Sequence, residues 1–455
     1  MIMFKEQKQY DLSQEEKIII LGSPSDSKLA AAIFTALDYD PESLEGAFEC
    51  LNPLKKLKAK ALIVLNTEKF DDISTVDEPF KGIQNLKNDA LVLVDTFKET
   101  HHSLLAEKLG VHHYKFTEFK TDKGALKTIH YHGNDLTAFN QGIILSEAIN
   151  FTRDLVNRPY NALNAEKLAD IALTFADIDN VTVKVLEKAD CETMGMGAFL
   201  GVNKGSKDAP KLIHITYKGD AGSQENTALV GKGVMYDTGG YSLKGVQSMP
   251  TMKMDMGGAA TVLGAMRAIA NLRLNANVSV VIAATDNKIG DDAIVPDDVL
   301  VSAQGTTIEI ISTDAEGRLT LADALWYAQK EGATRMIDVA TLTGAVVAAL
   351  GDEYVGAFTN NETFYQALGA SAKISREHVW LLPIGNAHRK SIESQVADLK
   401  NSGGRLGGAS IAAAFLDNFV NKEIPWVHLD IAGTAYKKES GATGVMVKTL
   451  TNPLN

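Results

Sequence analysis

Short apolar segments alternate with helix-like segments along most of the chain, and this alternation constrains the fold more than any other feature of the sequence. KIIILG at 17–22, ALIVLN at 61–66 and ALVLVD at 90–95 have the length and composition of strands that are buried on both faces. The first of them is followed by SPSDSKLAAAIFTAL, a helical segment with Ser or Asp available as an N-cap. Strands separated by helices predict a mostly parallel sheet with helices on its faces.

The same alternation continues in the second part of the chain. The apolar segments there fall at 211–219, 227–237, 277–286, 306–312, 335–341 and 426–433, with helices expected at 258–272 and 319–332. A chain of 455 residues exceeds what one hydrophobic core usually organises. We therefore expect an α/β protein of two domains, each a mostly parallel sheet flanked by helices, with the larger, C-terminal one carrying the chemistry.

The boundary between the two domains is expected near a long helix at 137–157. This segment, TAFNQGIILSEAINFTRDLVN, has apolar residues at helical spacing, and Pro159 ends it. We place an N-terminal α/β domain at 1–150 and the catalytic domain at 160–455. An ordinary helix of the first domain is the alternative interpretation of the same segment.

Net charge and cysteine content limit which partners and which cellular compartment are expected for the protein. The formal net charge is −12, and the N-terminal third has no clustered basic stripe, which argues against nucleic acid or an anionic membrane as the main partner. Cys50 and Cys191 are the only cysteines, so a disulfide framework is not expected. The charged start, and the absence of an apolar run of roughly 20 residues, predict a cytoplasmic protein that does not span a membrane.

Acidic and basic residues gather beside glycines in three segments of the second part, GKGVMYDTGGYSLK (231–244), KMDMGG (253–258) and STDAEGR (312–318). Asp314 and Glu316 are two residues apart, so in an extended segment both would face one centre. Arg318 lies near the start of a predicted helix, where an anion is favoured.

Four carboxylates that converged in a dry crevice would repel one another unless cations were present. Two divalent ions would balance Asp237, Asp255, Asp314 and Glu316 in charge and could hold a water between them. By its spacing alone, Lys232 reads as a surface or anion-binding lysine. The alternative for the carboxylates is that they are helix caps and surface acids on separate loops, and the residues alone leave this open.

The three segments resemble the motifs of the leucyl aminopeptidase family, the hexameric cytosolic dizinc aminopeptidases. The resemblance is carried by GKGVMYDTGGYSLK, MKMDMGGAA and above all TDAEGRLTLADAL. It continues through MIDVATLTGA (336–345), GGRLGGASIAAAFL (403–416) and HLDIAGTA (428–435). It covers nearly all of the chain after about residue 150, whereas the N-terminal part is similar only in its general α/β pattern.

The resemblance implies a metal-dependent aminopeptidase with two divalent ions, most often zinc or manganese. One ion would be bound by Asp237, Asp314 and Glu316, and a second, tighter one by Lys232, Asp237, Asp255 and Glu316. A water that bridges the two ions attacks the scissile carbonyl in this family. One ion also binds the free α-amine of the peptide, so residues are released from the N-terminus.

The two basic residues have separate implied roles. Lys244 would stabilise the oxyanion, as a fixed cation in a dry pocket can. Arg318 would hold a bicarbonate ion that acts as general base. The resemblance also implies a homohexamer and a preference for leucine and other aliphatic residues.

The implied side-chain pocket maps to Met252, Ser312, Thr341, Gly344, Ala432 and Ala435. Two of these positions depart from common members of the family: Ser312 replaces an Asn, and Ala435 is smaller than in some members. Asp297 replaces the glycine of a P-G-D-V turn, which suggests an altered turn, although Asp tolerates positive φ better than most residues.

Other functions fit the sequence less well. The glycine-rich stretches match neither phosphate-loop pattern, and neither G-x-S-x-G nor H-E-x-x-H is present. A dimetal phosphoesterase could use the same carboxylates, but the Lys232 ligand and the TDAEGR context favour peptide chemistry. DNA binding by residues 1–150 is the alternative from another class, because some family members double as DNA-binding regulators.

Overall fold

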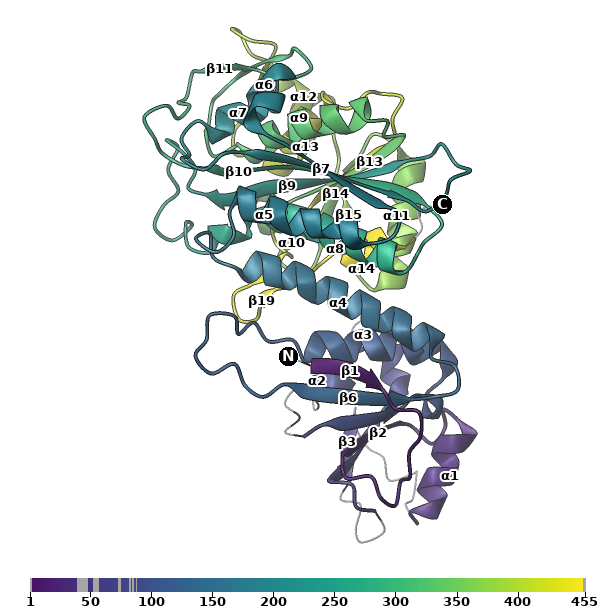
Figure 1. Cartoon of the computed structure of the whole chain (residues 1–455). Coiled ribbons are helices and arrows are strands. Elements are labelled where there is room, and N and C mark those ends of the chain that lie inside the picture. The colour runs from purple at the N-terminus through teal and green to yellow at the C-terminus, as the bar shows by residue number, and fades with distance from the viewer. Residues whose placement is uncertain are drawn as a thin grey trace. The chain divides into compact units, whose positions relative to one another are not determined.

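The structure is a computed structural model that describes residues 2–38, 48–51, 57–72, 75–81, 83, 86 and 88–452. Contacts divide the chain into two compact units, Met1–Asn150 and Phe151–Asn455. The division falls inside helix α4 (Thr137–Asn157), which occupies the residues for which the sequence predicts a long helix. Figure 1 shows the two units, the first in purple and blue and the second running from teal to yellow.

In the described part of the first unit, the strands pair in the order β1-β6-β5-β2-β4-β3, and all neighbours are parallel except β3 and β4. The elements are β1 (Ile2–Glu6), β2 (Ile18–Gly22), α1 (Lys28–Ala36), β3 (Phe48–Leu51), β4 (Ala61–Leu65), α2 (Glu78–Lys81), β5 (Ala90–Leu93), α3 (His102–His112) and β6 (Lys127–His132).

Helices cover both faces of this first sheet. Successive residues of a strand point to opposite faces, so Ile19 packs with Phe34 of α1, whereas Ile20 packs with Leu105 of α3. The helix α1 begins where the sequence supplies a cap, since the Ser27 hydroxyl accepts a hydrogen bond from the Ala30 N–H. The mostly parallel sheet with helices on both faces, expected for this part, is what the structure has.

The second unit contains a larger sheet with the strand order β15-β14-β17-β13-β9-β10-β8-β7 in the residues described. The central strands β17, β13, β9 and β10 are parallel neighbours, and antiparallel pairs occur toward the edges. The strands of this sheet are β7 (Val181–Leu186), β8 (Lys211–Lys218), β9 (Thr227–Asp237), β10 (Asn277–Asn287), β13 (Arg335–Ala340), β14 (Val355–Thr359), β15 (Val379–Leu381) and β17 (Trp426–Asp430).

Two apolar cores lie on the two faces of this sheet, as expected for a sandwich of helices. One core includes Leu168, Ala260, Leu368 and Leu450, and the other includes Phe199, Leu325 and Phe415. Figure 1 shows α5, α8 and α14 on one side of the sheet and α7, α9 and α13 on the other. The helices of the unit are α5 (Ala165–Leu173), α6 (Lys188–Thr193), α7 (Gly197–Asn203), α8 (Gly257–Asn271), α9 (Gly317–Lys330), α10 (Gly344–Leu350), α11 (Glu362–Ser375), α12 (Asn386–Lys390), α13 (Gly408–Asp417) and α14 (Val447–Thr451).

One segment that was expected to add a strand to the main sheet forms part of a separate small sheet instead. The segment 306–312 forms only the short strand β12 (Thr307–Glu309), which pairs with β11 (Val299–Val301) and β16 (Leu399–Lys400) in a separate small sheet. Ile308 is buried while Thr307 and Glu309 are half-exposed, so this strand has one covered face. A second small sheet pairs β18 (Tyr436–Lys437) with β19 (Gly441–Ala442).

The strand order of the main sheet reverses at β9. From β9 the chain passes through α8 to β10 on one side, and it later returns through α9 to β13 on the other side of β9. Open α/β sheets bind ligands where the strand order reverses in this way. Among the helices of the described residues, none has both the length and the apolarity needed to cross a bilayer.

Candidate active site

A buried lysine in β9 lies between two acidic side chains of the predicted site. Lys232 is 3% exposed, and its Nζ lies 2.8 Å from Asp255 Oδ2, 3.0 Å from Glu316 Oε1 and 3.0 Å from the carbonyl oxygen of Thr341. Burial alone would lower the pKa of Lys232, but the Asp255 and Glu316 carboxylates raise it above its ordinary value. Lys232 is therefore held as a cation between two acids from different segments.

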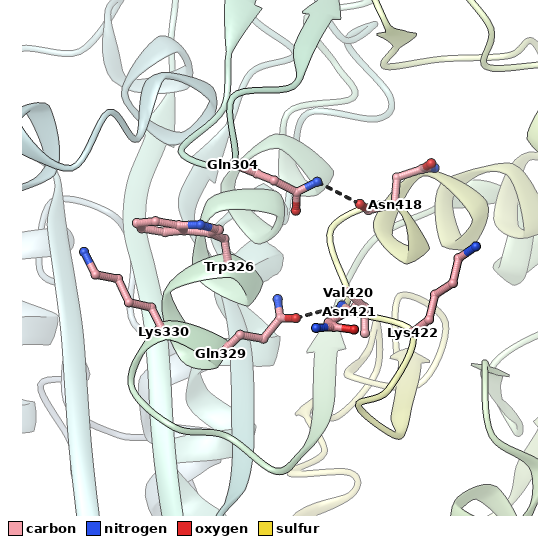
Figure 2. Close-up of a pocket in the computed structure, with 8 residues that line it drawn as sticks. All are labelled: Gln304, Trp326, Gln329, Lys330, Asn418, Val420, Asn421 and Lys422. Atoms are coloured by element: carbon pink, nitrogen blue, oxygen red, sulfur yellow. Dashed lines mark hydrogen bonds between the residues drawn. The ribbon is translucent and has the colours of Figure 1, made fainter.

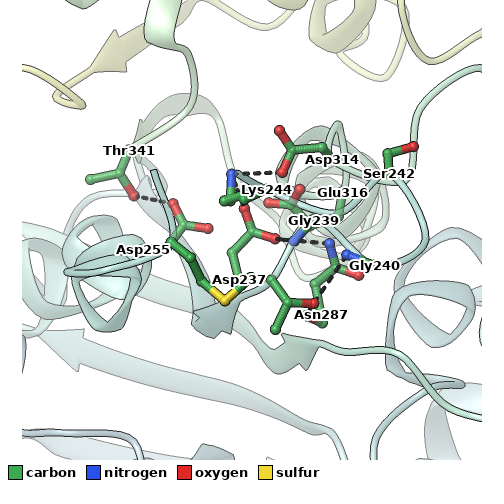
Figure 3. A network of polar contacts seen from close by, with 12 residues as sticks. Asp237, Gly239, Gly240, Ser242, Lys244, Asp255, Asn287, Asp314, Glu316 and Thr341 are labelled. Atoms are coloured by element: carbon green, nitrogen blue, oxygen red, sulfur yellow. Dashed lines mark hydrogen bonds and ion pairs between the residues drawn. The ribbon is translucent and has the colours of Figure 1, made fainter. Parts of the chain in front are cut away.

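A second lysine bridges the other two acids. Lys244 Nζ lies 2.7 Å from Asp237 Oδ2 and 2.6 Å from Asp314 Oδ1 (Figure 3). Burial would lower the pKa of Lys244, and the Asp237 carboxylate raises it instead. The structure thus brings together all four predicted carboxylates through two lysines, at the end of β9 where Asp237 stands.

Three of these carboxylates have the geometry of a cation site. Oxygens of Asp237, Asp255 and Glu316, all buried, lie within 4.8 Å of one another. Within the part of the chain that the structure describes, the buried Glu316 Oε2 has no hydrogen-bond partner, and Asp255 Oδ2 accepts no well-aligned hydrogen bond although Lys232 Nζ is close to it. Buried carboxylate oxygens without partners are costly. A divalent ion would satisfy them, so these residues fit a metal site.

The electrostatics of the cluster follow from burial and mutual repulsion. Burial, together with the charge of Glu316, raises the pKa of Asp237 to about 6. Burial also raises the pKa of Asp255 well above its ordinary value, against the opposing charge of Lys232. Burial would raise the pKa of Glu316 too, but Lys232 and Lys244 lower it below its ordinary value.

Asp314 differs from the other acids in position and in exposure. Its side chain is 37% exposed, compared with 2% for Glu316. The expectation of an extended segment here is wrong, because 313–314 form a turn and Glu316 has helical dihedral angles at the N-cap of α9. The helix that begins at Gly317 imposes helical geometry directly after the turn, so the alternation of a strand does not apply. As a result, Asp314 contacts Lys244, whereas Glu316 contacts Lys232.

Arg318 lies in the first turn of α9 with its guanidinium buried. Its Nη1 donates a hydrogen bond to the Asn401 carbonyl oxygen at 2.7 Å, while its Nε has no partner in the residues that the structure describes. Burial lowers the pKa of Arg318 to about 10 despite the nearby Glu316 and Asp430 charges, so the side chain stays cationic at neutral pH. A buried guanidinium with an unused N–H beside a helix N-terminus fits a small anion.

The six predicted pocket residues lie on several elements of the second unit. The hydroxyl of Thr341 donates to Asp255 Oδ1 at 2.9 Å. A Cβ placed on Gly257 would be 3.1 Å from Thr341 Cγ2 and 3.4 Å from Ala435 Cβ, so Thr341 and Ala435 lie close together. Ser312 Oγ accepts a hydrogen bond from the Asp314 N–H.

The other three predicted positions stand at or near the ends of other elements. Met252 begins the 3-10 helix η6 (Met252–Met256), which carries Asp255, and Gly344 begins α10. The Ala432 N–H donates to Asp430 Oδ1 after β17 ends.

Residues that the sequence did not single out also organise the site. Asn287, at the end of β10, donates from Nδ2 to Asp237 Oδ1 at 2.8 Å and to the Thr313 carbonyl oxygen at 2.9 Å (Figure 3). A Cβ on Gly240, which has φ +60°, would lie 2.9 Å from Asn287 Oδ1 and from Thr313 Oγ1. Asn287 directly follows the predicted strand 277–286, and a polar residue at the carboxyl end of such a strand is a signal that could have identified it.

Asp297, the departure in the P-G-D-V turn, has φ +77°. Its N–H donates to the Ile310 carbonyl oxygen, and the Ile310 N–H donates to the Asp298 carbonyl oxygen. The Asp residue therefore adopts the left-handed conformation that a glycine would favour.

A separate hollow lies at the opposite end of α9 from Arg318. Figure 2 shows Gln329 of α9 facing Asn421, which follows α13, and Trp326 and Lys330 of α9 also line this hollow. The Asn421 N–H donates to Gln329 Oε1 at 2.7 Å. Because Arg318 and Lys330 are at the two ends of one helix, this hollow is distinct from the acidic cluster.

Comparison with known proteins decides the family. Residues 150–451 match the catalytic domain of the cytosol aminopeptidase family. The chain belongs to the cytosol aminopeptidase family. The resemblance noted in the TDAEGR, DTGG and MDMGG segments is thereby confirmed, and with it the two-domain α/β class of the fold.

Two relatives are similar over most of their length. A probable cytosol aminopeptidase of Treponema denticola is 41% identical over 441 residues, which cover 93% of this chain and 89% of the relative. A probable cytosol aminopeptidase of Exiguobacterium sibiricum is 47% identical over 384 residues, or 81% of this chain and 80% of the relative. The chain is accordingly a leucyl-type aminopeptidase, a hydrolase of peptide bonds in a metal-dependent family.

Proposed function

We propose that the acidic cluster at the end of β9 is a two-metal centre that releases N-terminal amino acids, with aliphatic residues such as leucine preferred. The observation that carries the proposal is the meeting of buried Asp237, Asp255 and Glu316 oxygens within 4.8 Å, with Glu316 Oε2 lacking a hydrogen-bond partner. Asp314 and Lys232 complete the proposed ligand set. Lys232 would bind as a neutral amine, because adjacent divalent ions would lower the pKa of the ammonium group that Asp255 and Glu316 otherwise hold. Carboxylate sites of this kind accept zinc or manganese.

The roles of the residues follow from their positions. When bound, divalent ions would supply an activated water and polarise the scissile carbonyl. Asp255 is oriented by the Thr341 hydroxyl, and Asp237 is oriented by Asn287 Nδ2, so the carboxylates are held before a metal binds. Lys244 Nζ, fixed between Asp237 and Asp314, would stabilise negative charge on the substrate oxygen.

The buried Arg318 would hold a bicarbonate ion. Its Nε has no hydrogen-bond partner among the described residues, and the first turn of α9 adds the positive end of a helix dipole. When bound, bicarbonate would supply a general base beside the attacking water. The side-chain pocket would be formed by Met252, Ser312, Thr341, Gly344, Ala432 and Ala435.

The compartment and assembly remain part of the same proposal. The names of the two relatives support a cytoplasmic location. The homohexamer comes from the family resemblance, and peptides with a free N-terminus are the proposed partners.

Hydrolysis of leucine p-nitroanilide by protein stripped with a chelator and then given Mn²⁺ or Zn²⁺ tests this function. We expect activity only after metal is added, and a lower rate with lysine or aspartate p-nitroanilide. Lys244→Ala should lower kcat by about 10²–10³-fold, because a fixed charge at the oxyanion is lost. Glu316→Ala should abolish metal-dependent turnover.

The matched control is Lys330→Ala, which removes an exposed lysine at the other end of α9 and should leave the rate unchanged. Wild-type protein that is inactive with every divalent ion would overturn the function. Undiminished hydrolysis by Lys244→Ala and Glu316→Ala would overturn the site assignment while leaving the family intact.

A further inference from the structure

One asparagine outside the sequence motifs holds the backbone of the segment 311–315, which contains Asp314 and directly precedes Glu316. The side chain of Asn401 is fully buried, and its Oδ1 accepts hydrogen bonds from the Ile311 N–H at 2.8 Å and the Ser312 N–H at 3.3 Å. Its Nδ2 donates to the Ser312 carbonyl oxygen at 2.7 Å and to the Ala315 carbonyl oxygen at 3.4 Å. A single side chain therefore satisfies peptide groups at both ends of this short segment.

The backbone of Asn401 is tied to the same region. Its N–H donates to the Glu309 carbonyl oxygen at 2.9 Å, and its carbonyl oxygen accepts from Arg318 Nη1 at 2.7 Å. Asn401 directly follows β16, which pairs with β12 in the small sheet. Asn401 is thus anchored at the end of β16, and from there it contacts both the segment 311–315 and the first turn of α9.

The segment that Asn401 holds has no ladder of its own. Residues 311–316 belong to neither a strand nor a helix, and buried peptide groups in such a segment need side-chain partners. Asp314 leaves this segment toward Lys244, and Glu316 leaves it toward Lys232. Any shift of the backbone would move both carboxylates relative to Asp237 and Asp255.

We propose that Asn401 is a positioning residue that fixes the Asp314 and Glu316 carboxylates for metal binding and holds Arg318 in register with them. The inference rests on the proposed two-metal function and adds a residue to it. Outer groups that orient metal ligands typically change metal affinity by about 10–100-fold when they are removed.

Calorimetric titration of Mn²⁺ into chelator-treated protein tests this role without relying on turnover. Asn401→Ala should weaken Mn²⁺ binding by about 10-fold or more. The matched control is Asn277→Ala, because Asn277 also clamps a loop with its side chain. Its Nδ2 donates to the Asp220, Ser223 and Glu225 carbonyl oxygens, and its Oδ1 accepts from the Asp220 N–H.

Asn277 lies at the start of β10, whereas the site lies at the end of that strand. Both alanine variants should lose stability in urea, but Mn²⁺ affinity should fall only in Asn401→Ala. Asn401→Asp is the second variant in case the alanine protein does not fold. It keeps an acceptor for the Ile311 N–H and loses the two Nδ2 donors, so weaker Mn²⁺ binding is expected again.

Equal Mn²⁺ affinity in wild type, Asn277→Ala and the folded Asn401 variants would overturn the positioning role while the proposed function stands. Wild-type protein that binds no Mn²⁺ or Zn²⁺ would instead overturn the proposed function, and the inference with it. A fall in affinity of similar size in Asn277→Ala would show a general effect of stability and would also overturn the inference.

Discussion

At the scale of single residues, each acid of the site is paired with one of two lysines. Lys232 bridges Asp255 and Glu316, and Lys244 bridges Asp237 and Asp314. Two ammonium groups for four carboxylates leave an excess of negative charge in a buried place, which is costly. A divalent ion would remove this excess, so the same pairs that hold the site together also leave it poised to bind cations.

Asp323, in the middle of α9, is a buried carboxylate with a different role. Its Oδ2 accepts from the Phe199 N–H in the first turn of α7, and its Oδ1 accepts from the Ala303 N–H, both at 2.8 Å. Burial raises the pKa of Asp323 to about 7 despite these backbone donors. Asp323 therefore joins α9 to the start of α7 and to the loop at 303.

The raised pKa of Asp323 predicts a pH dependence of stability. An unfolded Asp titrates near 3.9, so between about pH 4 and about pH 7 the folded state binds more protons than the unfolded state. The contribution of Asp323 to the free energy of unfolding is thus full below this window, falls as pH rises through it and is constant above it. Asp323→Asn should remove this fall.

Urea unfolding followed by tryptophan fluorescence from about pH 5 to about pH 8 measures the effect. Asp170→Asn, which changes an exposed carboxylate on α5, is the control and should keep the pH profile of the wild type. A profile for Asp323→Asn that parallels the wild type would contradict the assignment.

At the scale of secondary structure elements, the packing of α9 against β9 depends on a glycine. A Cβ on Gly317, the first residue of α9, would lie 2.4 Å from Lys232 Cε and 2.6 Å from Lys232 Nζ. Lys232 cannot move aside freely, because Asp255 and Glu316 hold its ammonium group. The Lys232 side chain therefore packs directly against Gly317, where only a residue without a Cβ leaves room for it.

We predict that Gly317→Ala displaces Lys232 and damages the site. Overpacking of this kind typically costs about 1–3 kcal/mol, and metal-dependent hydrolysis should fall by more than the loss of stability explains. Gly369→Ala, in the middle of α11 with no atom near its added Cβ, should instead stabilise the protein by roughly 1 kcal/mol. Urea unfolding and hydrolysis at several Mn²⁺ concentrations compare the two, and equal behaviour would refute the steric argument.

Helices and strands could be predicted from the sequence because their signals lie within short segments. Contacts in the site between residues far apart in the sequence could not be predicted in this way. β9 and β10 are mostly apolar in sequence and buried along nearly all of their length, so their positions follow from the sequence. The Asn401 contacts to Ile311 and Arg318 join residues 90 and 83 positions apart, and no local pattern indicates them. The roles of Lys232 and Lys244 were inferred from the family resemblance, because spacing alone cannot show which acids a lysine will meet.

At the scale of the whole molecule, we propose that the two units are domains with separate stabilities. The first unit has apolar cores on both faces of its own sheet, as does the second. All three tryptophans, Trp326, Trp380 and Trp426, lie in the second unit. Tryptophan fluorescence therefore reports unfolding of the second unit, while far-UV circular dichroism reports helices and strands in both.

This difference allows metal binding to be assigned to one unit in the intact chain. A ligand that binds only the folded state at 100 times its Kd stabilises that state by about 2.7 kcal/mol. Mn²⁺ should therefore raise the urea midpoint of the fluorescence transition, while circular dichroism should show a second component that Mn²⁺ does not move. In Glu316→Ala the fluorescence shift should vanish, because the buried carboxylate with the unpartnered oxygen is gone. If one coincident transition moved as a whole with Mn²⁺, the two units would unfold together, and their description as independent domains would have to be abandoned.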